Sequence, residues 1–236
     1  MHRVLPQSIK PQAATMQTLP TAQLAPLEAL KSVAQIQHLR RRQRILASPN
    51  SALIVHSGVI AMETMLQPSV PGPLDIAYPG DILFLPHAEQ ASGFAAAPAE
   101  VWRLKCCDLA NAQSRDPALA EFVIRQLSAQ RQRAQLRRAV ISELPIDERL
   151  AALLIEFASR VGVTSNQGVT FDMPLSRAEI ASLLGLNADT LSRIMSRFTS
   201  EGLIARSSRT HVTVRGIDKL RSMCRFSNAV IEQATA

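Results

Sequence analysis

The sequence predicts an α+β fold with an N-terminal β-roll, one long helix, and a pair of short helices that a hairpin follows. Three stretches of the chain support this order. Residues 45–104 read as short strands separated by Gly and Pro, residues 117–144 form a helical pattern without either residue, and residues 176–215 contain two short helical patterns and a hairpin. Closely spaced short strands with such turns are typical of a small roll or barrel.

The same patterns divide the chain into five parts. We expect a mobile tail, a roll domain, a long dimerisation helix, a C-terminal domain and a second tail, over residues 1–24, 25–116, 117–144, 145–225 and 226–236. The first tail is rich in Pro, Gln, Ala and Thr without periodicity, which is typical of a segment that forms no core.

The composition favours a polyanion as the partner. The 236 residues include 26 Lys and Arg against 19 Asp and Glu, a net charge of +7, and only four of the basic residues are Lys. Arg presents a planar fork that binds phosphate or guanine through two hydrogen bonds. No run of about 18 apolar residues is present to span a membrane. Pro and Gln interrupt the N-terminus where a signal peptide needs an apolar core, so we expect a cytoplasmic protein without a membrane partner.

The cysteines and the other reactive residues indicate neither a metal site nor an enzyme. Cys106 and Cys107 are adjacent, and the three cysteines have neither the number for a disulfide framework nor zinc-ligand spacing. We expect reduced thiols. The order of a Ser/His/Asp triad, a metal motif and a phosphate-binding loop are all missing, so we predict that the protein is not an enzyme.

In the roll, a run of basic residues precedes the first long strands. Arg40, Arg41, Arg42 and Arg44 lead directly into strand-like sequence. Such a run suggests DNA or lipid binding, but we interpret it as the solvated edge of a strand.

The long helix begins after Asp116, with Pro117 at the position inside a helix start that tolerates proline. One semi-apolar stripe recurs at steps of three or four and contains Leu119, Val123, Gln126, Gln130, Ala134, Arg137, Ile141 and Leu144. Because a small roll is too short to cover such a helix, we expect a second copy of the chain to pack on this stripe. A further helix is predicted over residues 146–160.

Two short helices follow, joined by a tight turn. Ser176 and Glu179 have the spacing of a capping box, in which each side chain binds the backbone N–H of the other residue. Gly185 supplies the left-handed residue that ends the first helix, and Asn187 is a favoured cap for the next. This pattern predicts a helix-turn-helix over residues 176–199.

The second helix has two opposite faces at about 100° per residue. The apolar face contains Leu191, Ile194, Met195 and Phe198, and the polar face contains Asp189, Ser192, Arg193 and Ser196, with Arg197 on the flank. A short polar face rich in Arg suits base edges in a major groove. Residues 203–215 alternate with period two across a Ser-Ser-Arg turn, which predicts a hairpin that serves as a wing.

Residues 175–198, LSRAEIASLLGLNADTLSRIMSRF, closely resemble the DNA-binding domain of the Crp/Fnr transcription regulators. The segments 147–151 and 201–204 and the turns at Gly58 and Gly80 are similar to that family too, so the resemblance covers about residues 27–225. It implies a cyclic-nucleotide-binding-like roll, a homodimer on an inverted repeat of double-stranded DNA, and RNA polymerase as a further partner.

The resemblance also implies base contacts from the second helix. In the Fnr branch a Glu, a Ser and an Arg read the half-site, and they correspond to Asp189, Ser192 and Arg193. This implies Arg193 on guanine, Ser192 on a neighbouring base or phosphate, and Asp189 accepting from a cytosine amino group. Asp replaces the longer Glu, which puts the TTGA-like half-site in doubt, and Ala188 replaces an Arg of the Crp branch. The expected DNA contacts are Asp189, Thr190, Ser192, Arg193, Ser196 and Arg197, with Ser176 and Arg177.

The effector stays open among several alternatives. A cyclic nucleotide is disfavoured, because Asp81 lies near the family's ribose-binding place but residues 91–97 have no Arg for the phosphate. An iron-sulfur cluster is excluded by count, since no cysteine precedes Cys106 and Trp102 occupies the roll cysteine's place. Haem is a possible cofactor, with His2, His38, His56 and His87 as candidate ligands. A redox role of Cys106 and Cys107, or a roll that binds nothing, are further alternatives.

A different class of function competes with DNA binding. A winged helix also serves as a protein-interaction module. Purified protein that ignores specific duplex and captures a protein partner would favour that alternative.

Overall fold

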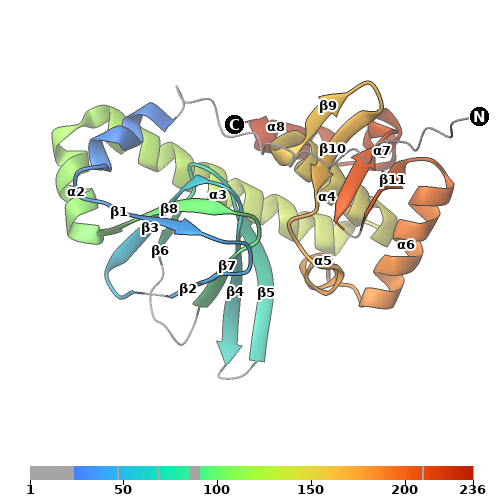
Figure 1. Cartoon of the computed structure of the whole chain (residues 1–236), viewed down its shortest axis with the longest axis horizontal. Helices are drawn as coiled ribbons and strands as arrows, with labels where there is room; N and C mark the ends of the chain where they lie inside the picture. Colours follow the sequence, from blue (N-terminus) through green and yellow to red (C-terminus); the bar gives the residue numbers. More distant parts are fainter. Residues whose placement is uncertain (1–23, 47, 68–69, 85–90, 209, 236) are drawn as a thin grey trace, which may run out of the picture.

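The computed structural model describes residues 24–46, 48–67, 70–84, 91–208 and 210–235. The α+β class is confirmed: an N-terminal roll and a C-terminal helical domain lie along one long helix (Figure 1). Apart from Leu24, the expected N-terminal tail falls outside the described residues. Among the described helices, none is long and apolar enough to cross a membrane.

The roll consists of a short 3-10 helix and eight strands. They are η1 (Ala25–Leu30), β1 (Gln35–Leu39), β2 (Arg44–Ile45), β3 (Ser51–Ser57), β4 (Ile60–Gln67), β5 (Val70–Ala77), β6 (Ile82–Phe84), β7 (Ala91–Ala95) and β8 (Ala99–Lys105). Two antiparallel sheets have the orders β1-β8-β3-β6 and β2-β7-β4-β5. Alternate residues of β3 and β8 face apolar clusters on opposite sides of their sheet, which is why β3 is almost wholly buried.

Two helices follow the roll, of which the sequence predicted only the second. Helix α2 (Cys106–Arg115) folds back on α3 (Pro117–Glu143). The Asp116 side chain caps α3 by accepting hydrogen bonds from the N–H groups of Ala118 and Leu119. The 27 residues of α3 give a rod of about 40 Å that passes both domains (Figure 1).

Both ends of the apolar stripe of α3 contact the same chain, and the second copy that we expect on this helix stays a prediction. Leu119 and Val123 are 0% and 4% exposed and pack into the roll cluster with Trp102. Besides the roll, α4 (Ile146–Val161) and α8 (Ser227–Thr235) also contact α3, which an argument from the roll alone did not foresee. A different face of α3 points outward and carries Ile124 and Leu127, which are 65% and 37% exposed.

The C-terminal domain consists of five helices and one sheet. Its elements are α4 (Ile146–Val161), β9 (Val163–Ser165), β10 (Gly168–Asp172), α5 (Arg177–Leu184), α6 (Ala188–Ser200), β11 (Ile204–Arg206), β12 (His211–Val214), α7 (Ile217–Met223) and α8 (Ser227–Thr235). The sheet order is β11-β12-β10-β9. The predicted wing hairpin is thus two strands of a four-stranded sheet, and the hairpin β9–β10 was not predicted.

The C-terminal tail that we expected over residues 226–236 is wrong for its described part. Residues 227–235 form α8, which packs along α4 and also contacts α3. Val230 is 5% exposed within the core of the C-terminal domain. Nine residues are too short for a clear periodic signal, and tertiary packing rather than local propensity stabilises such a helix.

Gly58 and Gly202 provide a test of the turn geometry. Both have positive φ, +86° and +72°, but a β-carbon on Gly58 would lie 2.6 Å from the Ala99 Cα atom, whereas Gly202 has nothing within 4 Å. We expect Gly202→Ala to lower the free energy of unfolding by about 1 to 2 kcal/mol through strain alone. Gly58→Ala should cost at least about 1 kcal/mol more, because the backbone of β8 must shift. Urea unfolding of both variants measures this, and equal losses would contradict the close approach at Gly58.

Candidate DNA-binding site

The first helix of the helix-turn-helix begins at the predicted capping box. The Ser176 N–H donates to Glu179 Oε2 at 2.7 Å, and the Glu179 N–H donates to Ser176 Oγ at 3.3 Å. Gly185 ends α5 in the left-handed region, with φ +65° and ψ +39°. These local signals were strong enough to place both ends of α5 from the sequence.

Helix α6 presents the predicted polar face to solvent. Asn187 caps the helix by accepting a hydrogen bond from the Thr190 N–H at 2.7 Å. The apolar face is buried, with Leu191 and Phe198 both 0% exposed. Asp189, Arg193 and the other expected contact residues on α6 lie on the opposite side, where Ser196 and Arg197 are also exposed and Thr190 and Ser192 are half-buried. The helix is therefore held by one face and free along the other, as a reading helix requires.

Arg197 differs from the other expected contacts because it is already engaged. Its guanidinium forms an ion pair with Asp147 in the first turn of α4 and lies 3.8 Å from Glu201. The side chain is 48% exposed, so it stays within reach of solvent. The Asp147 partner was not foreseen, since 50 positions separate the two residues.

The wing stands beside the first helix. The β11–β12 hairpin places Arg206 next to Arg177 at the start of α5, and burial together with the charge of Arg177 lowers the pKa of Arg206. Ser176 and Arg177 are both exposed on the first turn of α5. The structure thus brings the two expected residues of α5 to the same side as the wing.

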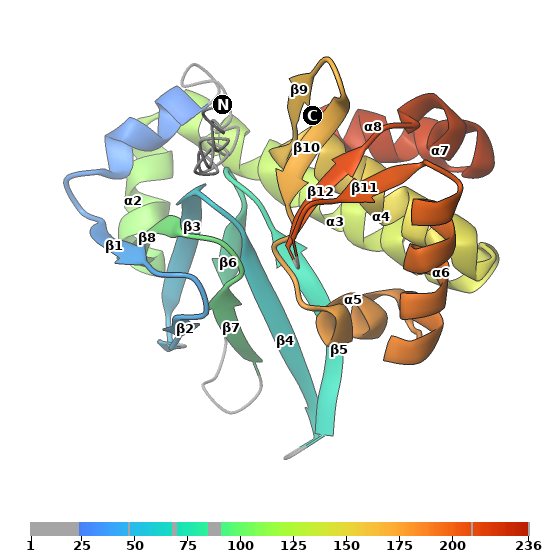
Figure 2. The ribbon, with the colours of Figure 1, turned by 45° about the vertical axis from the view of Figure 1, so that its right-hand side comes forward.

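The arginine run of the roll is exposed, as we expected of a solvated edge, but two of its members also contact the helix-turn-helix domain. Arg41 donates to the Met173 carbonyl at 3.0 Å, and Arg42 Nη1 lies 2.5 Å from Glu179 Oε1 of the capping box. Burial acts to raise the pKa of Glu179, but the hydrogen bonds from Arg42 and Ser176 outweigh it and lower that pKa. Figure 2 shows α5 between β5 and α6, so the roll meets the helix-turn-helix at this point.

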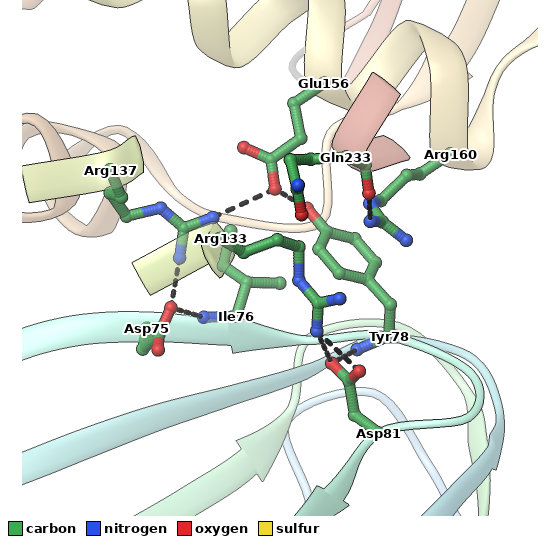
Figure 3. A network of polar contacts seen from close by, with 9 residues as sticks. All are labelled: Asp75, Ile76, Tyr78, Asp81, Arg133, Arg137, Glu156, Arg160 and Gln233. Atoms are coloured by element: carbon green, nitrogen blue, oxygen red, sulfur yellow. Dashed lines mark hydrogen bonds and ion pairs between the residues drawn. The ribbon is translucent and has the colours of Figure 1, made fainter. Parts of the chain in front are cut away.

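A second polar network joins the roll, α3 and α4 (Figure 3). Arg137 of α3 pairs with Asp75 of β5 and donates to Glu156 Oε1 of α4 at 2.9 Å. The Tyr78 hydroxyl donates to the same carboxylate at 2.9 Å, and the Arg160 guanidinium lies over the Tyr78 ring at 4.5 Å. Burial, and then the charge of Glu156, raise the pKa of Tyr78 well above its usual value.

Asp81, which the resemblance put near a ribose contact, pairs with Arg133 of α3. Asp81 is 2% exposed, and its two carboxylate oxygens each lie 2.5 Å from Arg133 Nη2 of α3. The same side chain accepts a hydrogen bond from the Tyr78 N–H at 2.9 Å. The acceptor that a ribose would need is therefore used by the protein itself.

The other candidate cofactor residues are on the roll surface or outside the described residues. His38 and His56 both lie near Glu100, at 3.6 and 3.2 Å, and His56 stacks on Trp102 at 4.7 Å. His2 and His87 lie outside the described residues. Cys106 is half-buried and Cys107 is exposed at the start of α2, and both are free thiols.

The charge of Glu156 should stabilise the joint between the roll and α4. Burial raises the pKa of Glu156, but Arg137 and Arg160 and the hydrogen bond from Tyr78 outweigh burial and lower it. A carboxyl group whose folded pKa is lowered stabilises the fold above its unfolded pKa, and this stabilisation is lost as the pH falls through the folded pKa. We expect Glu156→Gln to lower the free energy of unfolding by about 1 to 3 kcal/mol at neutral pH.

The pH dependence of urea unfolding checks this assignment. The difference between wild type and Glu156→Gln should shrink as the solution is acidified, whereas Glu121→Gln, at an exposed position of α3, should leave the stability unchanged. A difference that does not change with pH would show that Glu156 acts through packing and not through its charge.

Comparison with known proteins finds similar transcription regulators. A model of the Crp-like helix-turn-helix domain matches residues 148–223. The transcriptional regulatory protein btr of Bordetella pertussis is 30% identical over 48% of this chain and 47% of its own length. The transcriptional activator protein FnrL of Cereibacter sphaeroides is 25% identical over 82% of this chain and 83% of its own length. This chain therefore spans about half of btr but most of FnrL.

The solved structures support the same assignment at the level of the fold. FixK2 of Bradyrhizobium japonicum superposes with a TM-score of 0.69 at 22% identity, over 81% of this chain and 98% of that chain. The chain carries the same order of roll, long helix and helix-turn-helix that the sequence predicted. Residues 148–223 are therefore similar to the Crp-like helix-turn-helix domain, and most of the chain is similar to the transcriptional activator FnrL.

Proposed function

We propose that the protein is a sequence-specific DNA-binding transcription regulator that inserts α6 into a major groove. The observation that carries this proposal is the exposed polar face of α6, held rigidly by the buried apolar face on its other side. A helix of this kind at the second position of a helix-turn-helix is the element that contacts base edges. The net charge of +7 supports a polyanionic partner.

Three side chains of α6 supply the base contacts in this proposal. Arg193 forms two hydrogen bonds with guanine, Ser192 contacts a neighbouring base or phosphate, and Asp189 accepts from a cytosine amino group. Asp189 is in the first turn of α6, beside the Asn187 cap. The TTGA-like half-site is the starting sequence for a search. Because the carboxylate of Asp189 is one methylene shorter than that of Glu, the base preferred at its position can differ.

The remaining expected residues position the helix on the phosphate backbone. Ser176 and Arg177 are exposed where the N–H groups of α5 point outward, which favours a phosphate. Thr190 and Ser196 flank the base-reading residues along α6. Arg197 reaches a phosphate only by exchanging its ion pair with Asp147, so its contribution is the difference between two charged hydrogen bonds.

A homodimer on an inverted repeat is the second part of the proposal. The outward face of α3 carries Ile124 and Leu127, an exposed apolar pair on a long straight helix. Two copies related by a two-fold axis bury both residues and present two α6 helices to successive turns of the major groove. Because the similar protein FnrL is a transcriptional activator, the proposal includes activation through contact with RNA polymerase.

Removal of Arg193 tests the assignment of the reading helix. Arg193→Ala should cost about 1 to 3 kcal/mol of discrimination per half-site, because the guanine loses a bidentate partner. Fluorescence anisotropy with an inverted repeat of TTGA-like half-sites and with a scrambled duplex measures this discrimination. Arg221→Ala removes the same charge from α7 and should leave it unchanged. Equal discrimination by Arg193→Ala and wild type would refute the assignment.

Charges on the outward face of α3 test the dimer. Burial of a side chain such as Ile contributes about 1.5 to 3 kcal/mol. The substitutions Ile124→Arg and Leu127→Arg together should therefore weaken association at least about tenfold in sedimentation equilibrium. The control is Val33→Arg together with Val163→Arg, which adds the same charge at two other exposed apolar residues. If the double variant dimerises with the same dissociation constant as the wild type, the interface lies elsewhere.

A further inference from the structure

A cleft of about 620 Å³ lies between the roll, α5 and the wing. The roll contributes Arg41 and Arg42, the start of α5 contributes Ser176 and Arg177, and the wing contributes Arg206. The cleft thus combines side chains from both domains. Its volume falls within the range of small-molecule sites, about 300 to 1,000 Å³.

The charged groups of this cleft all have the same sign. Four arginines line it, and no carboxylate is among the lining residues that the structure describes. Arg42 pairs with Glu179 at 2.5 Å, and Arg177 is close enough to Arg206 for its charge to lower the pKa of Arg206. The first N–H groups of α5 also point toward this end of the helix. Several donors around one concavity, with a surplus of positive charge, suit an anion.

The floor of the cleft is apolar. It is formed by buried side chains, namely Met173, Leu175, Ile180, Met195 and Val212. A backbone phosphate of DNA lies on the outside of a stiff duplex and cannot follow a concave wall down to such a floor. A small molecule can place its charged group among the arginines and its apolar part on these residues.

We propose that this cleft binds a small organic anion, a phosphate ester or carboxylate with an apolar body, held by Arg41, Arg177 and Arg206. Such a ligand bridges the two domains, because Arg41 belongs to the roll and the other two arginines belong to the helix-turn-helix domain. Arg41 already holds the Met173 carbonyl, so a ligand there adds to an existing contact between the domains. The binding of this ligand does not depend on the proposed function. An effect of the ligand on DNA binding would rest on that function.

Calorimetric titration of the full chain with phenyl phosphate, without DNA, tests the site. We expect one ligand per chain, bound at least about tenfold more tightly than inorganic phosphate, because the phenyl ring covers the apolar floor. The double variant Arg41→Ala, Arg206→Ala should bind phenyl phosphate at least about tenfold more weakly, since each arginine supplies charged hydrogen bonds. Arg177→Ala, at an exposed position, should weaken binding in the same direction and does not disturb the core.

The matched control removes two arginines outside the cleft. Arg138→Ala together with Arg221→Ala lowers the net charge equally, and this variant should bind phenyl phosphate as the wild type does. Absence of binding, equal affinity for inorganic phosphate, or an unchanged affinity in all the cleft variants would overturn the proposal.

A third readout separates the small ligand from DNA. If phenyl phosphate does not bind but Arg41→Ala with Arg206→Ala reduces the salt dependence of binding to a random duplex, the cleft is a DNA-backbone contact and the proposal is overturned. The titration contains no DNA. If phenyl phosphate does not bind, the assignment of Arg193 to base contact is therefore unaffected. Loss of that discrimination would, conversely, leave the titration result standing.

Discussion

Two arginines of α3 hold the roll and the helix-turn-helix domain against the same helix. Arg133 binds Asp81 in the roll, and Arg137 binds both Asp75 of the roll and Glu156 of α4. The side chains of both arginines are at most 14% exposed, so neither can lose its partners without leaving a charge poorly solvated. The position of the helix-turn-helix relative to the roll therefore depends on these ion pairs.

Further ion pairs connect these arginines of α3 to α6. Glu156 connects α4 to α3, and Asp147 at the start of α4 connects to Arg197 of α6. A second connection runs outside the first, from Arg42 of the roll to the cap of α5. Both connections end on the helix-turn-helix, and the proposed anion cleft lies beside the second one. A change in the roll can thus reach the exposed face of α6, the proposed DNA contact, either through α3 or through the contact of Arg42 with α5.

The parts of the site that could be predicted from the sequence are those fixed by neighbouring residues. Ser176 with Glu179, Gly185 and Asn187 each act within four positions, and they placed α5 and α6 correctly. The parts that were missed depend on distant pairs. Arg42 meets Glu179 across 137 positions and Arg137 meets Asp75 across 62, and no local pattern contains that information. The stripe of α3 was found, but its contacts within the chain were not, because periodicity shows that a face is buried and not what covers it.

Selection of binding sites from random duplexes by the purified protein tests the central claim most directly, that two copies of α6 read an inverted repeat. The account predicts an enriched inverted repeat whose half-sites lie about 34 Å apart, one helical turn, because the two-fold axis of the dimer relates them. Enrichment of a single half-site or a direct repeat would contradict the symmetric dimer. No enrichment at all, with a protein partner captured instead, would contradict DNA reading by α6.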